Sequence, residues 1–163
     1  NEEPDIVHLQ CLNGYFVNIY RLINWLKVNR IRTVVTLHAE FMYTGGCGHS
    51  IDCNQWSTCE GCGHFTKCPR WRAETGALFF DRTETMWKRM KQAFNGFDDR
   101  LIVTSVSPWL MERAKISPIL EGKRHLDPMG PRCLFFYKHV QPFAIVLGFD
   151  CSVVCLSKAG FVR

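Results

Sequence analysis

The sequence predicts an α/β domain that is built on a parallel β-sheet with flanking helices. Short apolar runs of strand length, at residues 5–9, 33–37 and 100–104, alternate with segments whose apolar residues recur at helical spacing. This alternation is typical of βαβ units, in which a helix connects two parallel strands. The order strand, helix, strand, loop, helix, strand, helix predicts a doubly wound sheet, whose ligand sites lie at the carboxyl ends of the strands.

The first βαβ unit begins with the apolar run at residues 5–9, which is typical of a buried parallel strand and ends near Gln10. Apolar residues then recur at helical spacing over residues 16–29, and the charged and amide side chains between them predict an amphipathic helix. The second strand follows at residues 33–37. Two strands joined in this way require a parallel sheet and a right-handed crossover.

A long loop separates this unit from a second helix and a third strand. Residues 81–84 have the acid-then-Glu spacing of a helix start, and an apolar stripe continues the helix to Phe94. After the strand at residues 100–104, Ser107 with a proline directly behind it predicts the N-cap and first turn of a helix that runs to about Lys115.

Residues 1–125 are therefore predicted to form a partial domain of this class, and residues 126–163 are an unassigned tail. Prolines and a glycine break the pattern in the tail, and the strand-like run Phe143 to Phe149 has no helix after it. Three interpretations stay open. The tail supplies an edge strand, begins another domain, or does not belong to the fold of the first 125 residues.

The chain has 163 residues, of which 47% are apolar and 13% aromatic, a composition that excludes an intrinsically disordered protein. Its formal net charge of +5 comes from scattered basic residues. This charge suits a small anionic substrate or contact with a membrane surface, and it argues against a nucleic-acid partner. Because no apolar stretch approaches the roughly 20 residues of a membrane span and the start does not resemble a secretory signal, we expect a cytoplasmic protein.

The most unusual feature is a loop over residues 44–72 with five cysteines in the pattern C-x5-C-x5-C-x2-C-x5-C, which are Cys47, Cys53, Cys59, Cys62 and Cys68. In a reducing compartment clustered thiols favour a metal site over disulfides, and Cys59-x2-Cys62 has the spacing of a zinc knuckle. Four of the five cysteines, or a smaller number with His49 or His64, could hold a structural zinc ion. Reduced thiols or disulfides are the alternative, because x5 spacings are less typical of zinc sites.

A histidine directly follows the second strand. His38 stands where a parallel sheet opens its crevice, and an imidazole there can donate a proton or bind an anion near pH 7. The alternative is a histidine that only caps a backbone carbonyl. Glu40 could orient the imidazole or act separately, although a loop carboxylate is exposed by default. His8, inside the first strand, is expected to be a hydrogen-bonded core histidine.

A series of short segments matches one enzyme family in order: Pro4 to Leu9, Asn13 to Ile19, Val34 to His38, Thr44 to Cys47, Cys68 with Pro69, Leu101 to Thr104, and Ser107 to Leu110. In these segments the chain resembles the amino-terminal domain of family-4 glycosyltransferases of the bacterial exopolysaccharide and lipopolysaccharide type. The resemblance covers about residues 4–125.

The resemblance implies a Rossmann-like domain of a B-type glycosyltransferase. Such enzymes move a sugar from a nucleotide-sugar donor to a glycan or lipid-linked acceptor with retention at the anomeric carbon, here in surface polysaccharide synthesis. The chain would then be an acceptor-side fragment without its carboxyl-terminal donor domain, inactive alone, and cytoplasmic or peripheral to the inner membrane. The other hypothesis is a zinc-stabilised binding module without catalytic activity.

By position, His38 resembles the family's strand-end histidine, which faces the acceptor and the transferred sugar and would stabilise charge as the donor diphosphate leaves. Asn13 and Gly14 match the loop that the resemblance places beside the acceptor, and Glu40 is grouped with them. The chain also departs from the family. Gln10 stands where many relatives have a second histidine, Asn13 stands where a histidine often precedes the glycine, and the second half of the cysteine cluster is expanded, so the resemblance does not assign the zinc ligands one by one.

Overall fold

The computed structural model of the chain describes residues 4–10, 12, 17–126 and 154–157. The strands are β1 (Ile6–Gln10), β2 (Arg32–Leu37), β3 (Leu101–Ser105), β4 (Arg124–His125) and β5 (Val154–Ser157). The helices are α1 (Ile19–Val28), α2 (Trp71–Thr75), α3 (Thr83–Phe94) and α4 (Pro108–Lys115), with 3-10 turns at Glu40–Met42 and Gln55–Ser57. The predicted strands and helices of the first 125 residues are confirmed, with small shifts at their ends.

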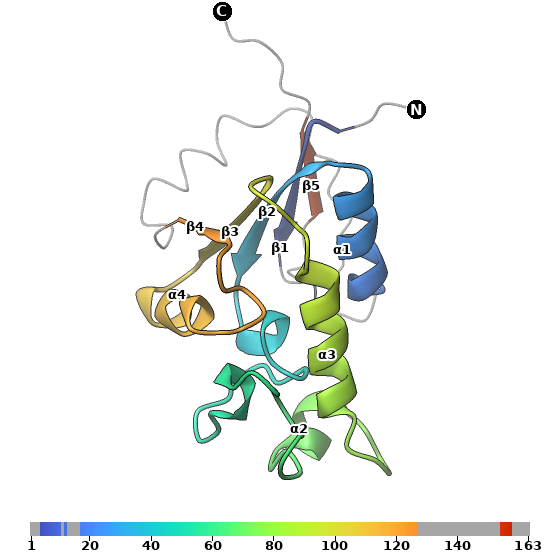
Figure 1. Ribbon diagram of the computed structural model, residues 1–163, viewed down its shortest axis with the longest axis vertical. Helices are drawn as coiled ribbons and strands as arrows, with labels where there is room; N and C mark the ends of the chain where they lie inside the picture. Colours follow the sequence, from blue (N-terminus) through green and yellow to red (C-terminus); the bar gives the residue numbers. More distant parts are fainter. Residues whose placement is uncertain (1–3, 11, 13–16, 127–153, 158–163) are drawn as a thin grey trace, which may run out of the picture.

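The strands form one sheet in the order β4-β3-β2-β1-β5 (Figure 1). The four strands β1 to β4 run parallel, and β5 runs antiparallel beside β1. The predicted α/β fold with a parallel sheet and flanking helices is therefore confirmed. The predicted doubly wound arrangement is not shown, because the described parallel strands follow one another in a single direction from β1 to β4 without the reversal that such a sheet has. β5 shows that one piece of the tail supplies an edge strand, while the run Phe143 to Phe149 lies outside the described residues.

The helix starts follow local capping chemistry. The Asn18 side chain accepts a hydrogen bond from the Arg21 N–H (3.1 Å) at the start of α1. Ser107 accepts from the Leu110 N–H (3.3 Å) at the start of α4, as predicted. α3 begins one residue later than a cap at Asp81 would place it, because Asp81 accepts from the Thr83 N–H and hydroxyl in a turn that precedes the helix.

Among the described residues, no helix is long and apolar enough to cross a membrane.

The core lies on one face of the sheet. Alternate residues of β1, β2 and β3 point into it together with buried residues of α1, α3 and α4, and they are Val7, Leu9, Val35, Leu37, Leu101, Val103, Ile23, Leu26, Trp87, Met90, Phe94, Leu110 and Ala114. Each large apolar side chain buried in this way contributes about 1.5–3 kcal/mol of transfer free energy. The same alternation puts His8 and Gln10 of β1 on the opposite face, where both are only partly buried.

The parallel register brings the carboxyl ends of three strands to one edge. Gln10 pairs with Thr36, and Leu37 pairs with Ser105, so β1, β2 and β3 end at nearly the same level. The cysteine-rich loop leaves β2 at this edge and packs below it, beside α3 (Figure 1). The fold thus brings the predicted strand-end histidine and the predicted cysteine loop to the same end of the sheet.

Candidate functional site at the carboxyl edge of the sheet

Two polar side chains meet where β1 and β2 end. His38 is exposed, and its Nε2 lies 3.2 Å from the Gln10 side-chain oxygen. With the amide oxygen as acceptor, Nε2 carries the proton. Burial of part of the ring lowers the pKa of His38, so the neutral ring prevails at pH 7. A neutral imidazole protonated at Nε2 has an acceptor at Nδ1, which suits a hydrogen bond from a hydroxyl group.

A second histidine stands behind this pair on the same face of the sheet. His8 Nε2 lies 2.7 Å from the Thr36 hydroxyl. Burial, and to a smaller extent the nearby His38, lowers the pKa of His8 to about 4. The hydrogen bond expected of a histidine inside the first strand is therefore present, but His8 is only partly buried and lies on the face of the sheet opposite the core. His8 is neutral throughout the physiological range.

The other residues expected beside an acceptor fall in two classes. Asn13 and Gly14 lie outside the described residues, so their role stays a prediction. Glu40 is described, and its side chain is fully buried. The default expectation of an exposed loop carboxylate was wrong. The reason is a set of polar partners that the loop and α4 bring around it.

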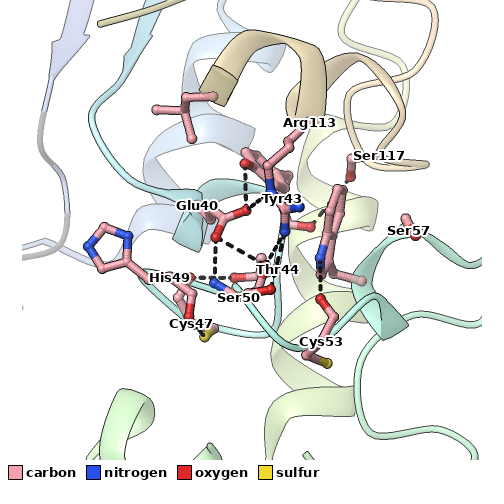
Figure 2. A network of polar contacts seen from close by, with 12 residues as sticks. Glu40, Tyr43, Thr44, Cys47, His49, Ser50, Cys53, Ser57, Arg113 and Ser117 are labelled. Atoms are coloured by element: carbon pink, nitrogen blue, oxygen red, sulfur yellow. Dashed lines mark hydrogen bonds and ion pairs between the residues drawn. The ribbon is translucent and has the colours of Figure 1, made fainter. Parts of the chain in front are cut away.

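Glu40 is the centre of a buried polar network (Figure 2). One carboxylate oxygen accepts from the Tyr43 hydroxyl (3.0 Å) and from Arg113 Nε (2.6 Å). The other oxygen accepts from the backbone N–H and the hydroxyl of Ser50. Burial, followed by the Glu40 charge, raises the pKa of Tyr43 well above its ordinary value, so this hydroxyl stays a donor. These contacts give Glu40 a role in holding the loop; its predicted contact with an acceptor stays a prediction.

Arg113 connects this network to α4. Its Nη2 donates to the hydroxyl (2.8 Å) and the backbone carbonyl (3.2 Å) of Ser50. Its guanidinium also stacks on two tryptophans, 4.7 Å from the centre of Trp56 and 5.0 Å from that of Trp109. Sequence reasoning did not find Arg113, because it lies 73 residues after Glu40 and no local pattern joins the two.

The cysteine loop packs tightly on the first turns of α3. The indole N–H of Trp87 donates to the carbonyl of the buried Trp56 (3.2 Å). Gly61 has a φ of +80°, and a Cβ there would lie 2.1 Å from the Trp87 ring. Close packing of this kind indicates that the loop has one defined conformation.

All five loop cysteines are free thiols. Cys47, Cys62 and Cys68 are buried, Cys53 is half-buried and Cys59 is exposed. Burial raises the pKa of Cys47 and of Cys62 to about 12 and also raises that of Cys68. Within the described part of the chain, no group of three or more His, Cys, Asp or Glu side chains is arranged to hold a metal ion.

The two histidines of the loop are not grouped with its thiols as metal ligands in the described residues, although the Cys47 thiol donates to the backbone carbonyl of His49 (3.1 Å). His49 is exposed, and its ring points away from the Glu40 network in Figure 2. His64 Nδ1 makes a 2.9 Å contact with Glu84 on α3. Neither placement supports the predicted substitution of a histidine for a sulfur ligand.

A surface hollow forms at the other end of the sheet. Asp5, Trp25, Arg30 and Arg32 line it, where β1 and β2 begin. Ligands of parallel α/β sheets bind at the carboxyl ends of the strands, so this hollow is not the expected place for a site.

Comparison of the chain with protein-family models, with curated proteins and with solved structures found no match. The candidate site therefore consists of the His38 and Gln10 pair at the strand ends, with the Glu40 network and the cysteine loop supporting the segment that follows His38.

Proposed function

We propose that this chain forms the acceptor-side domain of a retaining glycosyltransferase that moves a sugar from a nucleotide-sugar donor to a glycan or lipid-linked acceptor. The observation that carries the proposal is the His38 and Gln10 pair, exposed at the carboxyl edge of two adjacent parallel strands. Side chains that combine donors and acceptors at such an edge suit sugar hydroxyls. The sequence resemblance supports the same chemistry.

The neutral state of His38 sharpens its proposed role. A ring with a lowered pKa hydrogen-bonds a sugar hydroxyl without carrying a positive charge. An anionic diphosphate close to the ring would favour its protonated form and raise its pKa. We therefore infer that His38 is neutral while it binds an acceptor. When the donor diphosphate is bound nearby, the protonated ring is favoured and pairs with the negative charge of the diphosphate.

The proposal also implies a second domain that supplies the donor. Catalysis of group transfer depends on holding both reactants in one geometry. We expect the 163-residue chain to bind sugars at its strand-end pair but to show no sugar transfer alone. Sugar transfer by the isolated chain would contradict this part of the proposal.

Saturation-transfer NMR with a panel of UDP- and GDP-sugars and short oligosaccharides tests the site. We expect saturation of the sugar protons by the native chain and its loss in His38→Ala, because the substitution removes the imidazole donor and acceptor. His64→Gln is the matched control, since His64 is also an exposed, hydrogen-bonded histidine but belongs to the cysteine loop. Equal signals from the native chain and His38→Ala would remove His38 from the site.

A lipid-linked acceptor would bring the protein to a membrane surface, and an exposed apolar turn supports such contact. Leu78, Phe79 and Phe80 follow α2 and are 72–81% exposed, with the exposed cations Arg72 and Arg82 close in sequence. Large exposed apolar side chains flanked by cations are typical of surfaces that bind anionic lipids.

Co-sedimentation with vesicles of phosphatidylethanolamine and phosphatidylglycerol measures this contact. We expect Phe79→Ser with Phe80→Ser to weaken vesicle binding at least about tenfold, from the apolar area that no longer enters the membrane. Phe65→Ser is the control, because Phe65 is similarly exposed but lies outside this turn. Equal loss with the control, or no binding by the native chain, would contradict the membrane contact.

A further inference from the structure

An apolar surface lies at the same edge of the sheet as the strand-end pair of His38 and Gln10. Trp109 belongs to the first turn of α4 and is 52% exposed, and Val106, just before that helix, is 50% exposed. Sites for small ligands combine apolar or aromatic side chains with a few placed polar groups. The two exposed side chains therefore supply the part of a ligand site that the polar pair lacks.

Backbone contacts bring this apolar surface to the end of β2. Leu37 pairs with Ser105 in the parallel register, and the Val106 N–H donates to the Leu37 carbonyl (3.1 Å). The segment before α4 therefore lies against the residue that precedes His38. Because the Cα–Cβ bonds of a helix tilt toward its N-terminus, the first-turn position of Trp109 directs the indole toward this edge.

The buried network holds the Trp109 ring in place. The Arg113 guanidinium lies 5.0 Å from the centre of this ring, one helical turn further along α4. The same guanidinium stacks on the buried Trp56 and pairs with Glu40, and these contacts restrict its movement. An exposed aromatic side chain that is already fixed loses little conformational entropy when a ligand binds to it.

Sugar rings match this combination of surfaces. A pyranose carries hydroxyl groups around its rim and C–H bonds on its faces, and these C–H bonds have a weak positive polarity that suits the negative face of an indole. The hydroxyl groups suit the donor and acceptor atoms of His38 and Gln10. An anionic phosphate, by contrast, would be repelled by the negative face of the indole.

We propose that Trp109, with Val106 beside it, is a stacking surface for one pyranose ring of the acceptor, while the strand-end pair binds hydroxyl groups of the same glycan. The inference rests on the proposed function and narrows its acceptor to a glycan with an apolar ring face. It also gives the network of Glu40 and Arg113 a second role, since the network positions the ring that binds the sugar.

Saturation-transfer NMR with lactose and cellobiose on the full chain tests the stacking surface. In the native chain we expect the strongest saturation at the C–H protons of one ring face, because they lie against the indole. Trp109→Leu should lose this pattern and weaken binding about three- to tenfold, since leucine is apolar but offers no π face. Trp109→Phe should keep the pattern, because phenylalanine still offers such a face.

Trp25→Leu is the matched control. Trp25 is 51% exposed, but it lies on α1 and lines the hollow at the other end of the sheet. This substitution should leave the saturation pattern and the affinity unchanged. Leucine and phenylalanine both keep an apolar side chain at the half-exposed position of Trp109, so both of these variants should fold.

Four results would contradict the stacking surface, and only the last would also contradict the proposed function. The first is equal patterns for Trp109→Leu and Trp109→Phe, with binding lost in His38→Ala. The second is an equal loss in Trp25→Leu. The third is saturation of the uracil protons of UDP that is lost in Trp109→Leu while the disaccharide signals persist, which would assign the surface to a nucleobase. The fourth is a native chain that transfers no saturation to any sugar.

Discussion

His38 and Glu40 both follow β2 and are two residues apart, yet they differ in burial and in hydrogen-bond partners. His38 is exposed and hydrogen-bonds Gln10 at the edge of the sheet. Glu40 is fully buried, pairs with Arg113, and accepts further hydrogen bonds from Tyr43 and Ser50. The chain thus passes from an accessible polar pair to a saturated buried network in the space of one short turn.

This difference in burial predicts which substitutions change ligand binding and which change the stability of the fold. A buried carboxylate is tolerated only where an opposite charge and enough donors surround it, so the Glu40 network must form when the loop folds. An exposed pair needs little support and can exchange its hydrogen bond for one to a ligand. Substitutions in the network should therefore change the free energy of unfolding, and those in the pair should change binding.

The largest effect is expected from Arg113→Ala. The substitution leaves the Glu40 charge buried without its ion-pair partner and removes the cation stacking on Trp56. Loss of one partner of a buried ion pair costs about 3–5 kcal/mol. Urea unfolding followed by tryptophan fluorescence measures the change in the free energy of unfolding.

Two further variants test whether the loss of stability comes from the Glu40 carboxylate that is left buried without its ion-pair partner. Lys88→Ala removes an exposed ion pair with Glu84 (2.7 Å) and should cost less than about 1 kcal/mol. Adding Glu40→Gln to Arg113→Ala should restore part of the stability, because the buried charge is then gone. A double variant as unstable as the sum of the single changes would show that Glu40 and Arg113 act separately.

Much of the fold could be predicted from the sequence because its signals are local. The strand runs, the helical stripes, and Ser107 with the proline behind it depend on residues close in the chain, and each of these elements is present. β5 could not be placed in advance. Its pairing with β1 joins residues about 150 positions apart, and nothing in either segment specifies the antiparallel register.

The candidate site was predictable only where local sequence determines it. A histidine directly after a buried strand has to stand at the sheet edge, and His38 does. The burial of Glu40 depends on Arg113, whose approach follows from the packing of α4 against the loop. The clustering of cysteines was visible in the sequence, but which of them are buried depends on how the loop packs on α3.

A smaller and pH-dependent effect is expected from His8, which lies on the same face of the sheet as Gln10 but is more buried than His38. Its pKa of about 4 in the folded protein lies below the 6.5 of an unfolded histidine. Between these two values the unfolded chain binds a proton that the folded protein does not, so stability falls as the pH falls. Between pH 7 and pH 5 we expect a loss of about 2 kcal/mol, a window above the titration of most carboxylates.

Urea unfolding of the native chain and of His8→Gln at pH 7 and pH 5 isolates this contribution. Glutamine can keep a hydrogen bond to Thr36 but does not titrate, so the variant should lose most of the acid sensitivity. A smaller pH dependence should remain, because the pKa values of His38 and His125 are also lowered by burial. Parallel pH profiles for the two proteins would mean that His8 is solvated enough to protonate in the folded state, and His8 would then be as accessible to water as His38.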